Sequence, residues 1–308
     1  MMRLAVVIPY YNAPDDAEAC IRSVLRSTYP VEQVYVVDNS TLETDIAARF
    51  ALDGRVSVIR TAPRIGFGRA NNIGVAKATE AGADIAVVMN QDATIQPDAL
   101  EALVQPFAGD ANIALATPLV YAYDGTMRLT ETYVKMYIAP LTALLSDWSV
   151  GSVQPYYELQ RSMSGACVAV RCSAAQRYGL FCPLIDMYAE DVELFEHYRR
   201  IGQKAVLVPA AKLLHRHGHA AATGSKQRWV KRQIHKHTPV SIFTNIDKSI
   251  VACLTDWLAY ALRDYATAAA HGRFRLLSAF FLDDIQLFAF RMGAILKVRA
   301  EYAAQKPR

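Results

Sequence analysis

The stretch that decides the fold is Ile85-Ala86-Val87-Val88-Met89-Asn90-Gln91-Asp92, in which an apolar run ends abruptly at two amides and a carboxylate. An apolar run without polar alternation is typical of a strand whose two faces are both covered in a parallel sheet. Ligands of such sheets gather beyond the carboxyl ends of the strands. The stretch therefore predicts a buried strand that delivers Asp92 to a binding site.

The first part of the chain repeats such runs in alternation with helical patterns. The expected strands are Leu4 to Ile8, Val34 to Val37, Val56 to Ile59 and Ile85 to Met89. The expected helices are Asp15 to Ser27, Thr44 to Leu52, Gly68 to Ala81 and Pro97 to Phe107. This rhythm predicts right-handed crossovers and a mainly parallel sheet flanked by helices, so we expect an α/β fold.

The rhythm changes in the second part of the chain. Between residues 113 and 170 it loosens, and we expect antiparallel strands at Thr126 to Tyr137 and Val153 to Tyr157. Apolar residues at three- and four-residue spacing then predict helices at Ser225 to His237, Ser249 to Ala270 and Leu276 to Arg299. We expect a sheet-containing domain over residues 1–222 and a C-terminal helical region over residues 223–308.

The composition indicates a well-folded chain that does not bind nucleic acid. With 308 residues, 53% of them hydrophobic, the chain can bury a sizeable core. Its net charge of +4 is small, although residues 226–237 form a locally basic patch. We find neither a signal segment nor a continuous apolar stretch of roughly 18 to 20 residues, and therefore expect a cytoplasmic protein that does not span a membrane. The five cysteines are an odd number without metal-ligand spacing, which favours reduced thiols.

Three segments place polar groups at the ends of expected strands. They are Pro9-Tyr10-Tyr11-Asn12, Asp38-Asn39-Ser40 and Asn90-Gln91-Asp92. Because the carboxyl ends of parallel strands meet at one edge of a sheet, these groups should face one ligand. Asp38 could accept hydrogen bonds from the imide of a base or from a ribose hydroxyl. The alternative is that Asp38 caps the next helix.

Asp92 and Asn90 offer the hard oxygen ligands that suit Mg²⁺ or Mn²⁺, and such an ion can bridge the phosphates of a nucleotide. The alternative is that Asp92 caps the helix after Pro97 or orders a turn. His215 could complete the ligands of the ion, since neutral imidazole is acceptable to Mn²⁺. His217 and His219 follow it, so an exposed histidine-rich loop is the alternative.

Two further motifs precede expected helices. The segment Arg64 to Asn72 contains a glycine pair, which permits close approach to a phosphate or simply helix packing. Glu190-Asp191 opens a helical pattern whose positive end favours ionised carboxylates. An ionised Asp can act as a base, and ordinary charge at a helix start is the alternative.

In this order, the motifs resemble those of the family 2 glycosyltransferases of the GT-A fold, in particular the bacterial rhamnosyltransferase and galactofuranosyltransferase branch. The resemblance covers about residues 3 to 220. It rests on Val6 to Asn12, Val36 to Ser40, Gly66 to Gly74, Asn90 to Asp92, Ser164 to Ala166, Glu190-Asp191 and His215.

The resemblance implies an inverting, metal-dependent transfer of a sugar, with dTDP-rhamnose as the best candidate donor, to a polysaccharide or lipid-linked glycan of the cell surface. It assigns donor binding to Pro9, Tyr11, Asp38, Phe67, Asn72 and Asn90. It makes Asp92 and His215 the ligands of Mn²⁺ or Mg²⁺, Asp191 the general base, and Glu190 and Gly165 acceptor-binding residues. Donor binding would occupy about residues 1–120, and acceptor binding and catalysis about residues 121–222.

Asn90 departs from the family pattern, because it replaces the first Asp of an Asp-x-Asp motif. This substitution favours a second hypothesis, a noncatalytic nucleotide-sugar-binding or scaffold protein with a degenerate site. A nucleotidyltransferase ranks last, because no glycine-rich basic loop follows the first strand.

The C-terminal helical region lies outside the resemblance. Its basic start, Trp229 and the aromatic residues Phe280, Phe281, Phe288 and Phe290 could form an amphipathic surface in peripheral contact with the inner face of the cell membrane. Packing between helices or a homo-oligomer interface is the alternative.

Overall fold

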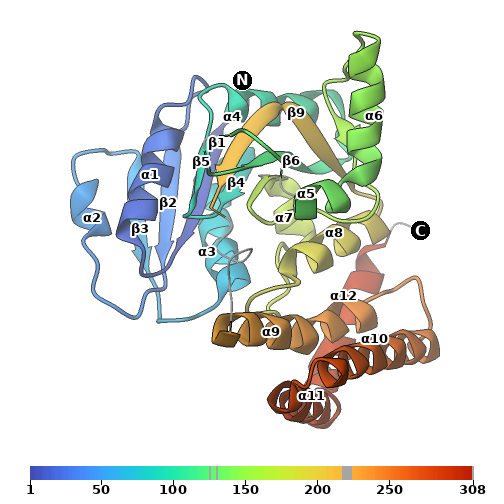
Figure 1. Ribbon diagram of the computed structural model, residues 1–308. Helices are drawn as coiled ribbons and strands as arrows, with labels where there is room; N and C mark the ends of the chain where they lie inside the picture. Colours follow the sequence, from blue (N-terminus) through green and yellow to red (C-terminus); the bar gives the residue numbers. More distant parts are fainter. Residues whose placement is uncertain (125, 130, 217–223, 307–308) are drawn as a thin grey trace. The chain divides into compact units, whose positions relative to one another are not determined.

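The computed structural model describes residues 1–124, 126–129, 131–216 and 224–306 (Figure 1). The chain packs as two compact units. The sheet unit comprises Met1–Phe181 and Gln203–His217, and the helical unit comprises Cys182–Gly202 and Gly218–Arg308. Residues 182–202, which we expected in the sheet-containing domain, thus pack with the C-terminal helices.

The sheet unit is built on one mixed sheet with the strand order β3-β2-β1-β4-β8-β6-β9-β5, in which β7 also pairs with β9. Its strands are β1 (Leu4–Tyr10), β2 (Gln33–Asp38), β3 (Val56–Arg60), β4 (Ile85–Met89), β5 (Ala93–Ile95), β6 (Ile113–Ala122), β7 (Tyr157–Glu158), β8 (Cys167–Arg171) and β9 (Lys204–His215). Strands β1 to β4 form the parallel half of the sheet, as expected: β1 pairs with β2 and β4, and β2 pairs with β3. β8 runs antiparallel to β4 and β6, and β5 and β7 run antiparallel to β9. The α/β fold class is confirmed, with the antiparallel pairs in the second half of the sheet.

Helices cover the sheet, which explains why its central strands lack polar alternation. Every residue of β1 and of β4 is buried. The helices of the sheet unit are α1 (Pro14–Leu25), α2 (Ile46–Arg49), α3 (Phe67–Glu80), α4 (Ala99–Gly109), α5 (Glu131–Met136), α6 (Ile138–Ser149) and α7 (Cys172–Tyr178). α3 approaches β1 closely at Gly74, where a Cβ atom would come within 2.2 Å of Val7 Cγ1.

The strand expected at Thr126 to Tyr137 is wrong, because helix α5 occupies the second half of that segment up to Met136, and Tyr137 is the N-cap residue of α6. The rings of Tyr133 and Tyr137 stack with centroids 4.4 Å apart, and the Tyr133 hydroxyl donates to the carbonyl of Pro118 at 2.8 Å. Side chains four residues apart share a helix face, so this burial outweighs the strand propensity of the local Thr, Tyr and Val residues. Of the strand expected at Val153 to Tyr157, only the last residue enters β7.

The helical unit consists of α8 (Glu190–Arg200), α9 (Gly224–Phe243), α10 (Ile250–Ala270), α11 (Phe274–Gln286), the π-helical turn η1 (Leu287–Arg291) and α12 (Met292–Gln305). Its core includes Val240, Phe243, Cys253 and Ile295. The helix expected over residues 276–299 is interrupted by η1, and such π-turns change the direction in which the following side chains point. No helix of the described residues combines the length and the apolar composition that crossing a bilayer requires. The five cysteines are all buried and free.

Candidate active site

Asp92 and His215 meet through the pairing of two strands. After β4 ends at Met89, residues Asn90 to Asp92 form a turn, and β5 then pairs antiparallel with β9 so that Ala93 lies opposite His215. The N–H of Arg216 donates to the carbonyl of Asp92 at 3.0 Å. This register places Asp92 Oδ1 3.1 Å from His215 Nε2. The alternative that Asp92 caps the next helix is excluded, because β5 and a turn separate it from α4.

Asn90 completes this cluster from the other side. Its N–H donates to the carbonyl of Ala166 at 2.9 Å, across the junction of β4 and β8, and its Nδ2 lies 3.2 Å from His215 Nε2. Asn90 Oδ1 is buried and has no hydrogen-bond partner among the described residues. A buried acceptor without a partner is costly unless a ligand satisfies it.

The three side chains fit a divalent cation. A carboxylate oxygen, an amide oxygen and an imidazole nitrogen are ligands that Mn²⁺ accepts. His215 Nε2 faces a hydrogen-bond donor on Asn90 and an acceptor on Asp92, and this nitrogen is the one that would bind the ion. Within the described ranges, no group of three or more His, Cys, Asp and Glu side chains converges. The described residues therefore offer only a partial set of ligands. His217 and His219 lie outside the described residues.

Gln91 holds the turn against the end of the first strand, a role that the sequence analysis missed. The N–H of Tyr11 donates to Gln91 Oε1 at 2.7 Å, and Gln91 Nε2 donates to the carbonyl of Tyr11 at 3.1 Å. These paired bonds tie the loop after β1 to the loop after β4. The Tyr11 hydroxyl accepts from Arg64 Nε at 3.2 Å, and its pKa is lowered by hydrogen bonds to Thr41 and Arg64.

Asp38 is only 2% exposed and already has partners. It pairs with Arg60, and its Oδ1 accepts from the N–H of Ser40 at 2.9 Å. Arg60 ends β3 directly opposite Asp38 in the parallel register, and no local motif had indicated it. The alternative of a helix cap is excluded, because the N-cap residue of α2 is Asp45. Pro9 is buried within β1 beside β2.

The remaining candidates of the sheet unit mostly serve its framework. The Asn72 amide donates to the carbonyl of Phe181 at 2.8 Å and accepts from its N–H at 3.0 Å, so both of its ends bind backbone. Phe67 packs edge-on against the Phe181 ring at 5.7 Å. Gly165 lies beside Ala166, which receives the hydrogen bond from Asn90, so this candidate is next to the cluster.

Glu190 and Asp191 belong to the helical unit, where they begin α8 as expected. The two residues before them, Tyr188 and Ala189, both have left-handed backbones with φ of 65° and 73°. Two adjacent non-glycine residues in this region cost roughly 1–3 kcal/mol each, and such strain is concentrated at functional sites. Asp191 Oδ1 accepts from the N–H of Val192 at 2.8 Å.

Glu190 differs from its neighbour in its protonation. Burial, together with the negative charge of Asp191, raises the pKa of Glu190 to about 8. Its Oε2 is buried and has no hydrogen-bond partner among the described residues. At neutral pH Glu190 is therefore mainly a neutral acid that can donate a hydrogen bond.

Comparison with known proteins identifies the family. The model of "Glycosyl transferase family 2" matches residues 5–179, more than half of the chain. The N-acetylglucosaminyl-diphospho-decaprenol L-rhamnosyltransferase of Mycobacterium tuberculosis (strain ATCC 25618 / H37Rv) is 25% identical over 236 residues, which cover 70% of this chain and 77% of that protein.

Two solved structures share the fold. The mannosyltransferase PcManGT from Pyrobaculum calidifontis, in complex with GDP-Man and Mn²⁺, has a TM-score of 0.58 at 17% identity and covers 99% of this chain and 86% of that chain. GalNAc-T7 with UDP, GalNAc and Mn²⁺ has a TM-score of 0.57 at 17% identity. That match covers 78% of this chain and 51% of the GalNAc-T7 chain, so this chain spans about half of its length. The expected GT-A fold is confirmed, and the chain belongs to glycosyl transferase family 2.

Proposed function

We propose that the protein is an inverting, metal-dependent glycosyltransferase that moves a sugar from a nucleotide diphosphate donor to a polysaccharide or lipid-linked glycan in cell-surface glycan synthesis. The observation that carries the proposal is the cluster of Asp92, His215 and Asn90 at the carboxyl end of β4, in a chain of this family. The similarity to the mycobacterial rhamnosyltransferase supports rhamnose, with dTDP-rhamnose as the best candidate donor.

We assign the metal site to Asp92 and His215, with the unpaired Oδ1 of Asn90 turned to the ion or to the donor. When bound, Mn²⁺ or Mg²⁺ neutralises the charge that develops on the departing diphosphate. Because the described residues offer so few ligands, we expect phosphate oxygens and water to supply the others. The ion should therefore bind tightly only together with the donor.

The nucleoside is assigned to the loops that follow β1 and β2, with Pro9, Tyr11 and Asp38 as the binding residues. The pair between Asp38 and Arg60 fixes the end of β2, and the Gln91 bonds fix Tyr11, so this part of the site is preorganised. Phe67 and Asn72 would support it by positioning α3, and Gly165 would lie on the acceptor side.

Asp191 is assigned the role of general base. It would take the proton of the acceptor hydroxyl, whose oxygen would form the new bond at the anomeric carbon while the bond to the diphosphate breaks on the opposite face. Configuration at that carbon is thereby inverted. Glu190, as a neutral acid, would donate a hydrogen bond that seats the acceptor.

Binding of a panel of nucleotide diphosphate sugars, measured by thermal shift with Mn²⁺, Mg²⁺ or a chelator, tests the donor site. At a donor concentration of about 100 times its Kd, we expect the cognate donor to raise the Tm by roughly 5 °C in a metal-dependent way. Asp92→Asn should abolish that shift. Asp98→Asn is the matched control, because Asp98 is exposed and its side chain makes no capping bond. A donor shift that survives in Asp92→Asn would contradict the assignment.

The second candidate is a noncatalytic nucleotide-sugar-binding or scaffold protein. Asn90 favours it, because the amide lowers the negative charge beside Asp92. This hypothesis predicts the same donor-dependent shift without turnover when glycan acceptors are supplied. A homo-oligomer is compatible with either hypothesis.

A further inference from the structure

An outward-facing apolar stripe runs along helix α10. Val251, Leu254, Leu258 and Leu262 recur at three- and four-residue spacing, and they are 70%, 39%, 51% and 60% exposed. Residues at this spacing share one helix face, and an amphipathic helix normally buries that face. Here the stripe lies on the solvent side of the helix.

A second stripe, on α11 and η1, lies across from the first. It contains Phe274, Phe281, Ile285 and Phe288, which are between 43% and 73% exposed. The π-helical turn η1 contributes Phe288, whose ring packs edge-on against Trp257 at 4.7 Å, and leaves Phe290 80% exposed. Phe280, by contrast, is buried against His235, so it does not belong to the expected aromatic surface.

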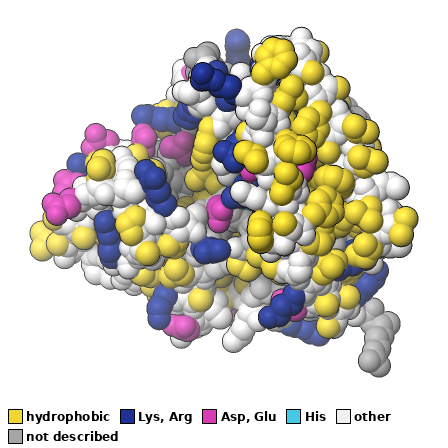
Figure 2. All heavy atoms as spheres, turned by 90° about the horizontal axis from the view of Figure 1, so that it is seen from below, with side chains coloured by type: hydrophobic (Ala, Val, Ile, Leu, Met, Phe, Trp, Pro, Cys, Tyr) yellow, Lys and Arg dark blue, Asp and Glu magenta, His cyan; other side chains and the backbone are white. Residues whose placement is uncertain are grey.

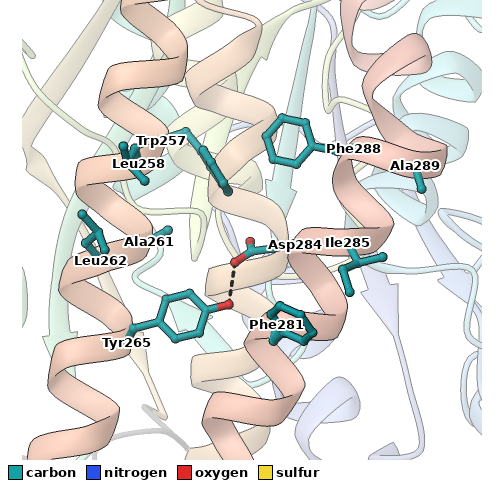
Figure 3. A pocket seen from close by; sticks show the side chains of 10 residues that line it. All are labelled: Trp257, Leu258, Ala261, Leu262, Tyr265, Phe281, Asp284, Ile285, Phe288 and Ala289. Carbon is teal, nitrogen blue, oxygen red and sulfur yellow. Dashed lines mark hydrogen bonds between the residues drawn. The ribbon is translucent and has the colours of Figure 1, made fainter.

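The two stripes enclose an apolar groove of about 730 Å³ within the helical unit (Figure 3). Leu258 and Leu262 line it from α10, and Phe281 and Ile285 from α11. One carboxylate, Asp284, reaches the groove. It accepts from the Tyr265 hydroxyl at 2.8 Å and lies 3.2 Å from His235 Nε2 beneath, so its charge is compensated by these partners.

The helical unit also carries the positive charge of the protein. The helical unit, Cys182–Gly202 with Gly218–Arg308, contains 16 Lys and Arg against 11 Asp and Glu, a net charge of +5, whereas the whole chain has +4. The remainder of the chain is therefore net negative. Three of these eleven acids, Asp264, Asp283 and Asp284, bind His235 or Arg232 inside the bundle and do not offset the outer surface. Seen from below, hydrophobic side chains gather over the helical unit with Lys and Arg at their margin (Figure 2).

From these observations we infer that the face formed by α10, α11 and η1 binds the surface of an anionic lipid bilayer. The stripes supply apolar side chains that enter the boundary between headgroups and acyl chains, and Arg263 and Arg275, adjacent in sequence to stripe residues, supply positive charge for the lipid phosphates.

A second copy of the chain is the less favourable occupant. A twofold interface through this face would bring two helical units of net charge +5 together. Like charges in apposition oppose association unless a counter-charge is supplied. An anionic surface supplies that charge, and a copy of the same face does not.

Vesicle co-sedimentation of the full chain tests the inference without requiring enzymatic turnover. We expect binding to phosphatidylcholine vesicles that contain phosphatidylglycerol, little binding to phosphatidylcholine alone, and loss of binding at high salt. Arg263→Glu with Arg275→Glu should weaken binding by at least about tenfold. Leu258→Gln with Phe281→Gln should weaken it by a similar factor and leave far-UV circular dichroism unchanged, because both side chains are exposed.

Matched control variants distinguish binding through this face from a general effect of changing the charge or the apolar surface of the protein. Arg161→Glu with Arg177→Glu makes the same charge change in the sheet unit, and Leu42→Gln with Leu52→Gln removes two exposed leucines there. Both controls should bind vesicles like the wild type. Equal loss in the controls, or no preference for anionic vesicles, would overturn the inference. The inference would also be overturned if sedimentation equilibrium showed a dimer that Leu258→Gln with Phe281→Gln dissociates. That result would mean that a second copy of the chain covers the face.

Discussion

Within the proposed site, individual residues divide between chemistry and support. Asp92, His215 and Asn90 form one hydrogen-bonded cluster, and Gln91, between two of them in sequence, binds backbone instead. Alternation along the turn thus sends Asn90 and Asp92 to one side and Gln91 to the other. Glu190 and Asp191 are adjacent carboxyl groups, and because the burial of Glu190 and the charge of Asp191 raise the pKa of Glu190 to about 8, Glu190 is the one that holds its proton.

Glu190→Gln should separate the two roles. Since Gln resembles a protonated Glu, we expect kcat/KM at pH 7 to stay within about threefold of the wild type. Wild-type kcat/KM should fall as the pH rises through about 8, where Glu190 ionises, and the variant should lack that fall. The measurement is a pH profile of both proteins. A loss of roughly a hundredfold at pH 7 would mean that the ionised carboxylate is required.

The acidic residues at the ends of strands can be predicted from the sequence more readily than the side chains that bind them. Asp38 and Asp92 follow apolar runs and are therefore visible, whereas Arg60 becomes meaningful only when β2 and β3 are aligned so that Asp38 and Arg60 are opposite each other. That pairing could be deduced by matching the ends of adjacent parallel strands. The contact between Asp92 and His215 could not, because the residues are 123 positions apart and their pairing depends on the antiparallel register of β5 with β9.

Among the secondary-structure elements, the strands predicted from continuous apolar runs are confirmed, and the segment whose structure depends on tertiary burial is not. β1, β2, β3 and β4 appear where continuous apolar runs predict them. The segment that becomes α5 was expected as a strand because its residues favour strands, and tertiary packing of Tyr133 decided otherwise. The stripe on α10 shows the same limit, since its spacing predicts a helix but not which side faces solvent.

One buried histidine joins three helices of the helical unit. His235 on α9 contacts Asp264 on α10 at 2.8 Å and Asp284 on α11 at 3.2 Å, and the Phe280 ring stacks on it at 3.9 Å. Burial alone would lower the pKa of His235, but its hydrogen bonds to the two carboxylates and their charges outweigh burial and raise the pKa above its ordinary value. The stability that this raised pKa contributes is therefore complete below the ordinary histidine pKa and is lost as the pH rises through the folded value.

His235→Gln should consequently cost more stability at pH 6 than at pH 9. The measurement is the urea midpoint of unfolding of wild type and variant at both pH values. The difference between the two proteins at one pH removes the contribution of other titrating groups. His271→Gln is the control, since His271 is exposed and hydrogen-bonds to the carbonyl of Thr267 rather than to a carboxylate. A cost of His235→Gln that is equal at the two pH values would contradict the charged histidine.

In the whole molecule, chemistry and charge are divided between the units. The sheet unit holds the residues assigned to donor and metal, and the helical unit holds the acidic pair and the net positive charge. Donor binding and proton removal are thus assigned to residues that can be altered independently. Asp191→Asn should leave the donor site intact, which allows binding and turnover to be measured on the same variant.

The most direct test is the release of nucleoside diphosphate from the cognate donor in the presence of a glycan acceptor, compared between wild type and Asp191→Asn. The account predicts that Asp191→Asn lowers kcat by roughly 10²–10⁴-fold, as expected for loss of a general base. The variant should keep the metal-dependent donor shift of the wild type. Turnover at the wild-type rate in Asp191→Asn would contradict the account.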